Sequence, residues 1–164
     1  MTSAATTQFE REIREQPDVL ARVLADPTIA NVGASLRAAA PSLVLSFARG
    51  SSDNALSFFA YLAGVALGLP VASVPPSLMT LSAAPMQARG ALALGVSQSG
   101  ESRDVVAALR AAAERGAMTL AVANTPTSSL AQRADFALEQ HAGIERAVAA
   151  SKTFTSQMMV LARV

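Results

Sequence analysis

The feature that most constrains the fold is a regular alternation of short apolar runs with amphipathic segments. Apolar runs of strand length occupy residues 43–48, 71–74, 92–96, 118–122 and 136–139. Between them, apolar residues recur at helical spacing, as in residues 56–67 and 105–113. Strands that alternate with helices predict βαβ units. We therefore expect an α/β fold, a three-layer αβα sandwich around a mostly parallel five-stranded sheet of the flavodoxin-like or Rossmann-like kind.

Helical patterns precede the first strand and follow the last one. Residues 9–25 read as a helix that breaks at Pro17, and residues 28–40 read as a second helix that ends before Pro41. We therefore assign residues 1–40 to an N-terminal helical segment and residues 41–164 to a single domain. The chain stops inside a further apolar helical pattern, formed by Phe154, Met158 and Leu161.

Composition excludes several classes of protein. Thirteen basic residues against twelve acidic ones leave a formal charge of +1, so we expect no nucleic-acid partner and no acidic membrane surface. The chain has no cysteine and one histidine, which excludes disulfides, thiolate catalysis and a multi-histidine metal site. No apolar run approaches the ~18 residues of a membrane span, and the N-terminus lacks the blocks of a signal peptide. We expect a cytoplasmic protein.

Small polar residues cluster directly after two of the apolar runs. RGSSDN follows the first strand as residues 49–54, and SQSGES follows the third as residues 97–102. Open parallel sheets bind ligands beyond the carboxyl ends of their strands, where glycines permit close approach and helix N-termini favour anions. The alternative is that these serines only cap helices. Because two such corners exceed what capping requires, we interpret them as a phosphate site; the chain has no Walker loop or G-x-G-x-x-G motif that would indicate a nucleotide cofactor.

Four segments, in order along the chain, resemble the sugar isomerase (SIS) domain family. SQSGES at 97–102 is similar to its S-Q-S-G-E-T signature, and ARGSS at 48–52 to its G-S-S corner. VAASKTFTSQ at 148–157 resembles V-A-S-T-K-A-F-T-x-Q, and EIREQP at 12–17 resembles the helix that opens members with two SIS domains. The resemblance is to the first SIS half of glucosamine-6-phosphate synthase or glucosamine-6-phosphate deaminase. Within it, the segment VAASKTF is more similar to the deaminases than to the synthases.

The resemblance implies roles for particular residues. Ser97, Gln98, Ser99 and Ser102 would hold a sugar 6-phosphate, with Ser102 keeping the hydroxyl of the usual threonine. At the first corner, Gly50 would allow the turn, and Ser51 and Ser52 would contact the sugar chain. Val148 and Ala149 would line the sugar with backbone groups. The family's chemistry, aldose–ketose isomerisation or its amino-sugar equivalent with loss of ammonia, needs no metal or organic cofactor, but it needs a general base.

The other polar residues near these motifs have weaker signals. Glu145 is only a weak candidate for the catalytic base, because the resemblance places the catalytic glutamate in the second SIS half. Lys152 is interpreted as structural or as a solvated surface group, His141 as an exposed loop residue and Glu101 as a residue of a first helical turn. Arg49 would neutralise phosphate or form a structural ion pair.

Two functional classes stay open on these grounds. The chain is either the phosphosugar-binding half of an amino-sugar 6-phosphate deaminase or isomerase, acting on glucosamine 6-phosphate or fructose 6-phosphate, or a non-catalytic, regulatory SIS module. We expect it to be the first half of a protein about twice as long, unable to complete catalysis alone. The only ligand we expect is a sugar phosphate, and the apolar face of the last helical pattern predicts a homodimer or higher oligomer.

Overall fold

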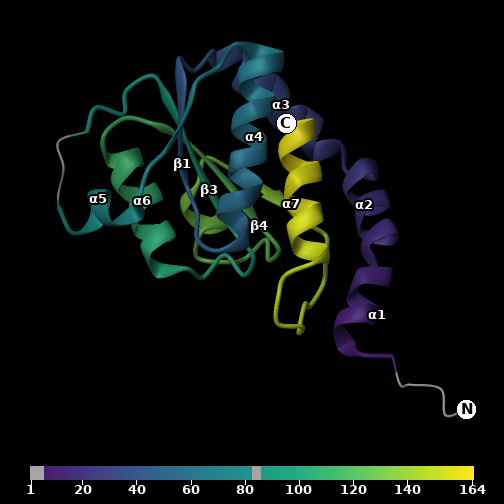
Figure 1. The fold of residues 1–164 in the computed structure, drawn as a ribbon. Coiled ribbons are helices and arrows are strands. Elements are labelled where there is room, and N and C mark those ends of the chain that lie inside the picture. Colours follow the sequence, from purple (N-terminus) through teal and green to yellow (C-terminus); the bar gives the residue numbers. More distant parts are fainter. Residues whose placement is uncertain (1–5, 83–85) are drawn as a thin grey trace, which may run out of the picture.

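A five-stranded sheet, parallel throughout, forms the centre of the computed structural model, which describes residues 6–82 and 86–164 (Figure 1). The first five residues of the predicted N-terminal segment lie outside the described residues. The strand order is β2-β1-β3-β4-β5. The strands are β1 Leu43–Phe47, β2 Val71–Ser73, β3 Ala91–Ser97, β4 Met118–Ala123 and β5 Phe136–Glu139. The predicted α/β fold and its parallel sheet are confirmed.

Helices cover both faces of this sheet. They are α1 Gln8–Arg14, α2 Gln16–Ala25, α3 Pro27–Ala39, α4 Ser51–Leu67, α5 Pro76–Thr80, α6 Arg103–Glu114 and α7 Lys152–Arg163. The break expected at Pro17 is confirmed, because Glu15 separates α1 from α2 and Pro17 lies in the first turn of α2. A single 3₁₀ turn, η1 Ala131–Arg133, precedes β5, and the short helix α5 was not predicted. Among the described residues, no helix combines the length and apolarity that a membrane span requires.

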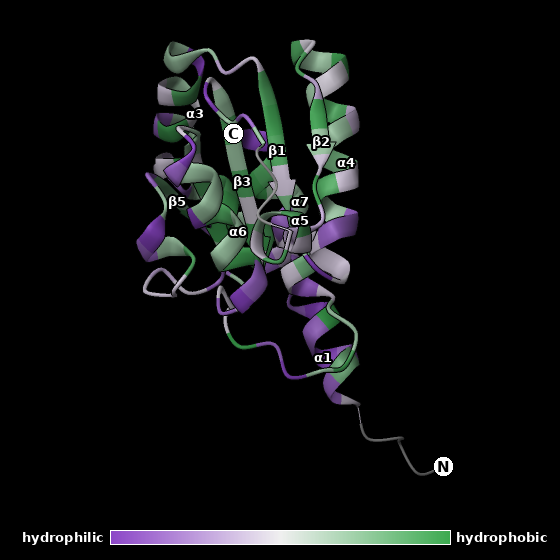
Figure 2. Ribbon diagram, turned by 90° about the vertical axis from the view of Figure 1, so that its left-hand side faces the viewer, coloured by the Kyte–Doolittle hydropathy of each residue, from purple (hydrophilic) through white to green (hydrophobic). Residues whose placement is uncertain are grey.

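The two faces of the sheet bury different kinds of side chain. On β3, Leu92, Leu94 and Val96 face a core that α3, α4 and α7 complete. Ala91 and Ala93 face the opposite core, which α5 and α6 complete. The alternation of large and small residues lets α6 approach its face closely. Figure 1 shows helices on both sides of the strands, and Figure 2 shows the apolar residues along β1.

The N-terminal helix α2 lies beside α7, and α1 lies beside the loop that leads into α7 (Figure 1). Glu12 on α1 is completely buried and accepts the N–H groups of Arg146 and Ala147 at 2.8 and 3.0 Å. Lys152, at the start of α7, is 3% exposed, and its Nζ lies 2.5 Å from the Glu15 carboxylate. The structural role of Lys152 is therefore confirmed, and its alternative as a solvated surface group is wrong.

Replacing Glu12 with glutamine should lower the free energy of unfolding by about 1.5–3 kcal/mol, because charge-assisted hydrogen bonds to the loop are lost. Burial alone would raise the pKa of Glu12, but the bonds from Arg146, Gln8 and Ala147 outweigh it and hold that pKa below its usual value. The contribution is thus complete above the pKa of an unfolded glutamate and is lost as the pH falls through the lower folded pKa. Urea unfolding at several pH values measures this.

The matched control is Asp18→Asn, which removes an exposed carboxylate from the neighbouring helix α2. It should leave stability within about 0.5 kcal/mol of the unaltered chain. Equal losses from both substitutions would contradict the anchoring role of Glu12.

Candidate functional site

The candidate site lies where the chain leaves neighbouring strands in opposite directions. β1 pairs with β3 over its whole length, from Leu43 opposite Ala91 to Phe47 opposite Gly95. After β1 the chain continues to β2 on one side, and after β3 it continues to β4 on the other. The two connections therefore diverge and leave a crevice beyond the carboxyl ends of β1 and β3, the usual ligand position in open α/β sheets.

Both predicted polar corners open into this crevice. A hollow of about 270 Å³ lies between them. Its lining residues are Arg49, Gly50, Ser51, Ser52, Val96, Ser97, Gln98, Ser99 and Ser102. The structure therefore brings together every serine predicted for the site, with Gly50 and Gln98, although the two corners are far apart in the sequence.

The second corner is a tight turn that its own serines stabilise. Ser97 is 4% exposed, and its Oγ accepts the N–H of Gly100 at 3.1 Å and lies 3.2 Å from Ser102 Oγ. Ser99 Oγ accepts the N–H of Glu101 at 3.2 Å. Gly100 has a φ of 75°, a left-handed conformation that glycine adopts without strain. The turn therefore presents several hydroxyls toward one small space.

The helices that follow the two corners begin without side-chain caps. Neither the N-cap of α4, Gly50, nor that of α6, Ser102, provides a side-chain hydrogen bond to its helix. The interpretation of these serines as simple helix caps is therefore wrong. Since uncapped N–H groups and the positive ends of two helix dipoles meet at the hollow, the local electrostatics favour an anion.

An ion pair joins the first corner to α6. Arg49 Nε lies 2.5 Å from Asp104 Oδ2, which confirms the structural ion pair as one role of Arg49. Burial raises the pKa of Asp104, but the hydrogen bonds from Arg49 and from the Val105 N–H lower it by more than burial raises it. The pKa of Asp104 therefore lies below its usual value. The side chain of Arg49 is 59% exposed, so the pair leaves guanidinium surface at the rim of the hollow.

Glu145 lies on the far side of the second corner, where donors surround its carboxylate. Its Oε1 accepts the N–H groups of Ser151 and Lys152 at 2.8 and 2.9 Å. Its Oε2 accepts the hydroxyl of Thr153 and the amide of Gln98, the latter at 3.3 Å. Glu145 therefore binds the start of α7 and ties it to the serine corner.

Three other predicted residues lie outside the hollow. Val148 is 98% exposed, Ala149 is exposed with a φ of 78°, and neither is among the lining residues. Glu101 precedes α6 instead of occupying its first turn, and it binds Ser129.

The prediction of an exposed His141 is wrong. Its ring is 25% exposed and lies between Asp26 Oδ2, at 2.9 Å from Nε2, and Glu139 Oε2, at 3.6 Å from Nδ1. These contacts join the end of β5 to the start of α3. They depend on a long-range approach that local sequence does not indicate.

A pair of buried amides beneath the second corner was not predicted from the sequence. Gln140 is completely buried and donates to the carbonyl of Ser97 at 2.9 Å and to that of Val122 at 3.3 Å. Gln157 donates to Gln140 Oε1 at 3.5 Å, whereas Gln157 Oε1 has no partner among the described residues. Gln157 belongs to the motif at 148–157, but no sequence signal distinguished Gln140. These amides hold the end of β3 in place.

Within residues 6–82 and 86–164, no three histidine, aspartate or glutamate side chains gather in a way that could hold a metal ion. The polar side chains of the hollow itself carry hydroxyls, one amide and one guanidinium. Such a set suits an oxyanion rather than a cation.

The fold and the site together define an α/β domain that presents an oxyanion-binding corner at a strand switch point. The SIS domain profile matches residues 40–163, and the chain belongs to the SIS domain family. This match contains both serine corners and all of α7.

Several relatives are glutamine–fructose-6-phosphate aminotransferases. The protein of that name from Gloeobacter violaceus is 36% identical over 156 residues, which cover 91% of this chain and 25% of the relative. The one from Zymomonas mobilis is 50% identical over 78 residues, which cover 48% of this chain and 13% of the relative. The chain thus spans a quarter or less of these curated relatives.

Solved structures show the same fold. A protein from Silicibacter pomeroyi assigned as a phosphosugar isomerase superposes with a TM-score of 0.91 and 42% identity over 96% of this chain and 50% of that one. The C-terminal domain of glucosamine-fructose-6-phosphate aminotransferase from Francisella tularensis superposes with a TM-score of 0.85 and 27% identity, over 99% of this chain and 47% of that one. A glucosamine-6-phosphate deaminase from Thermotoga maritima, at 21% identity and a TM-score of 0.74 over 94% of this chain and 48% of that one, shares the fold.

Replacing Gly100 with alanine should destabilise the second corner more than an ordinary left-handed glycine substitution. An alanine there would be strained by about 1–2 kcal/mol, and its Cβ would also collide with Ser128. Chemical denaturation should show a loss beyond the strain alone.

Gly143→Ala provides the control, since Gly143 has a φ of 63° but has open space where a Cβ would lie. The loss of stability from Gly143→Ala should be limited to the backbone strain. If the two substitutions cost the same, the close contact with Ser128 does not constrain the turn.

Proposed function

We propose that the chain is a phosphosugar-binding SIS domain that takes an amino-sugar or ketose 6-phosphate, such as glucosamine 6-phosphate or fructose 6-phosphate. The observation that carries this proposal is the convergence of serine hydroxyls and two uncapped helix N-termini on one hollow. A phosphate dianion accepts hydrogen bonds from several directions, and this set of donors matches that need.

The division of roles follows the two corners. Ser97, Gln98, Ser99 and Ser102 bind the phosphate, because their corner offers hydroxyls, free N–H groups and the N-terminus of α6. Ser51 and Ser52, across the hollow at the start of α4, contact the sugar chain.

Val148 and Ala149 contribute backbone groups to the sugar on this proposal. Both lie on the exposed loop that Glu12 and Glu145 hold at its two ends. Ligand binding would have to bring this loop toward the hollow.

The proposed reaction of the parent enzyme is aldose–ketose isomerisation, or deamination of an amino-sugar phosphate. Either requires a base that moves a proton between adjacent carbons. Glu145 is poorly suited to this task, because backbone and hydroxyl donors already occupy its oxygens. We therefore assign it to positioning and expect the base to come from outside this chain.

The alternative function is regulatory or non-catalytic binding of the same ligands. The hollow supports both functions equally, since binding precedes either outcome. Ammonia release from glucosamine 6-phosphate separates them: we expect saturable binding by the chain without turnover. Measurable release would show that the chain contains a complete catalytic set.

Calorimetric titration with glucosamine 6-phosphate tests the site itself. Ser99→Ala and Ser102→Ala should each weaken binding by about 2–10-fold, the effect of losing one neutral hydrogen bond. Ser35→Ala, which removes a hydroxyl bonded to the Asn31 carbonyl on α3, should bind as the unaltered chain does. Unchanged affinity in both corner variants would contradict the proposal.

The apolar face of α7, from which association was expected, is largely covered within the chain, because Leu161 is buried and Phe154 and Met158 pack against the core. We propose instead that the chain associates through α4, with a second copy as the occupant. Phe58, Tyr61 and Val65 follow one another at helical spacing on its outer face and are 41%, 81% and 86% exposed. An apolar stripe of this kind favours burial against a partner. This chain matches half of the Silicibacter pomeroyi structure, so the other half of that chain is long enough to form a second unit of this size.

A cytoplasmic location of the protein stays a prediction.

Sedimentation at micromolar concentration should show a dimer or a larger assembly. Tyr61→Asp combined with Val65→Asp should shift the chain to a monomer without loss of fold, because both side chains are largely exposed. A monomer for the unaltered chain would contradict this proposal and leave the ligand site unaffected.

A further inference from the structure

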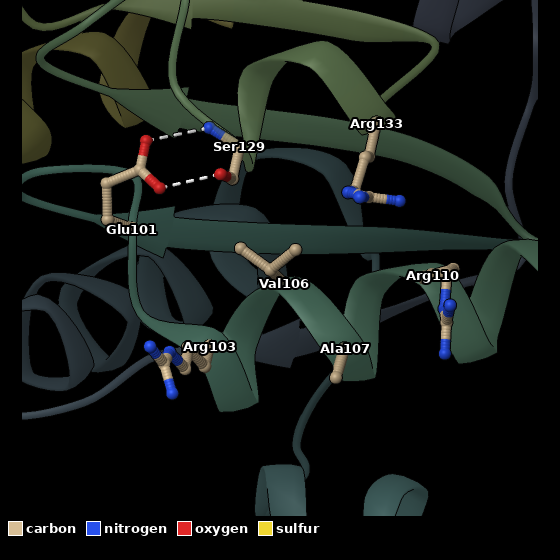
Figure 3. A pocket seen from close by; sticks show the side chains of 7 residues that line it. All are labelled: Glu101, Arg103, Val106, Ala107, Arg110, Ser129 and Arg133. Carbon is tan, nitrogen blue, oxygen red and sulfur yellow. Dashed lines mark hydrogen bonds between the residues drawn. The ribbon is translucent and has the colours of Figure 1, made fainter.

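A second hollow, about 570 Å³ in volume, lies beside the outer surface of α6 (Figure 3). Its floor includes Val106 and Ala107, and Arg103 and Arg110 rise from α6 on either side of them. Arg133 extends toward α6 from η1. The serine hollow contains none of these residues.

This hollow concentrates positive charge. Three arginines and one glutamate line it, whereas the whole chain has a formal charge of only +1. Within the described residues, Arg103 and Arg133 have no side-chain hydrogen-bond acceptor or ion-pair partner. Arg110 lies 3.6 Å from Glu114, but both side chains are more than 60% exposed, so this pair contributes little.

Arginine clusters of this kind recognise anions well. A guanidinium offers several donors in a planar fork that matches phosphate and carboxylate groups. Like charges that share one hollow repel each other, and an anion between them would remove that repulsion. The volume is within the range of small-molecule sites.

The opposite end of the hollow limits what can enter. Glu101 accepts the Ser129 hydroxyl at 2.6 Å and the Ser129 N–H at 2.9 Å, and these two bonds hold its pKa below the usual value. Its carboxylate is therefore ionised at neutral pH. An extended acidic peptide would meet this negative charge, whereas a compact anion can lie at the arginine end and place neutral hydroxyls near Glu101.

We propose that this hollow is a second anion site, distinct from the phosphosugar site, which binds a small molecule with at least two phosphate or carboxylate groups. Arg110 and Arg133 hold the anionic groups, Arg103 adds a third cation, and Val106 with Ala107 contacts the body of the ligand. The proposal does not depend on the proposed function of the serine hollow.

The test is a titration of the ¹⁵N-labelled chain with inorganic pyrophosphate and, separately, with citrate. Binding should shift the amide signals of Val106, Ala107, Ser129 and Arg133. The double variant Arg110→Gln/Arg133→Gln should bind at least about tenfold more weakly, because two charge-assisted contacts are lost. A response to pyrophosphate alone would assign the site to phosphates, and a response to both would assign it to polyanions in general.

Two controls separate this site from general charge effects and from the serine hollow. Arg14→Gln/Arg37→Gln removes the same charge from exposed positions on α1 and α3 and should bind like the unaltered chain. Ser99→Ala/Ser102→Ala should weaken glucosamine 6-phosphate binding but retain the shifts at Val106 and Ala107. Shifts confined to residues 97–102, or equal weakening by both arginine pairs, would overturn the proposal.

Discussion

The parallel pairing of β1 with β3 is the interaction on which the rest of the site depends. It aligns Phe47 with Gly95, so the two strands end at the same edge and their polar corners face each other. Because the chain then diverges toward β2 and β4, no connection covers the gap in the part of the chain that the structure describes. Two helix N-termini converge there without side-chain caps, and the resulting positive potential is a property of the backbone as much as of the serines.

Buried and half-buried polar groups stabilise this arrangement from beneath. Gln140 binds the carbonyl at the end of β3, and Glu145 joins the start of α7 to Gln98. Glu12, on the first helix, accepts two N–H groups from the loop between β5 and α7. Burying such groups is costly unless they are hydrogen-bonded, and here nearly all of their capacity is used. The N-terminal helices are thereby coupled to the loop that borders the proposed ligand site.

Sequence patterns predicted the elements that depend on local physics. Apolar runs located all five strands, and Pro17 located the break between α1 and α2. The serine corners were recognisable because small residues and glycine follow a buried strand. The short helix α5 was missed because prolines at 75 and 76 obscure helical periodicity, although proline is well tolerated in a first helical turn. The surface positions considered for Lys152 and His141 were wrong because their partners, Glu15 and Asp26, lie more than 100 residues away in the sequence.

By itself, the sequence determined the order of strands and helices along the chain, the parallel α/β class and the residues of the two serine corners, because periodicity and turn chemistry act over a few residues. Only the tertiary structure decided which corners meet, that Glu145 caps α7, and that three arginines from α6 and η1 share one hollow. These contacts depend on the order of the strands in the sheet and on how the helices pack against it. Such contacts join residues that have no common local pattern.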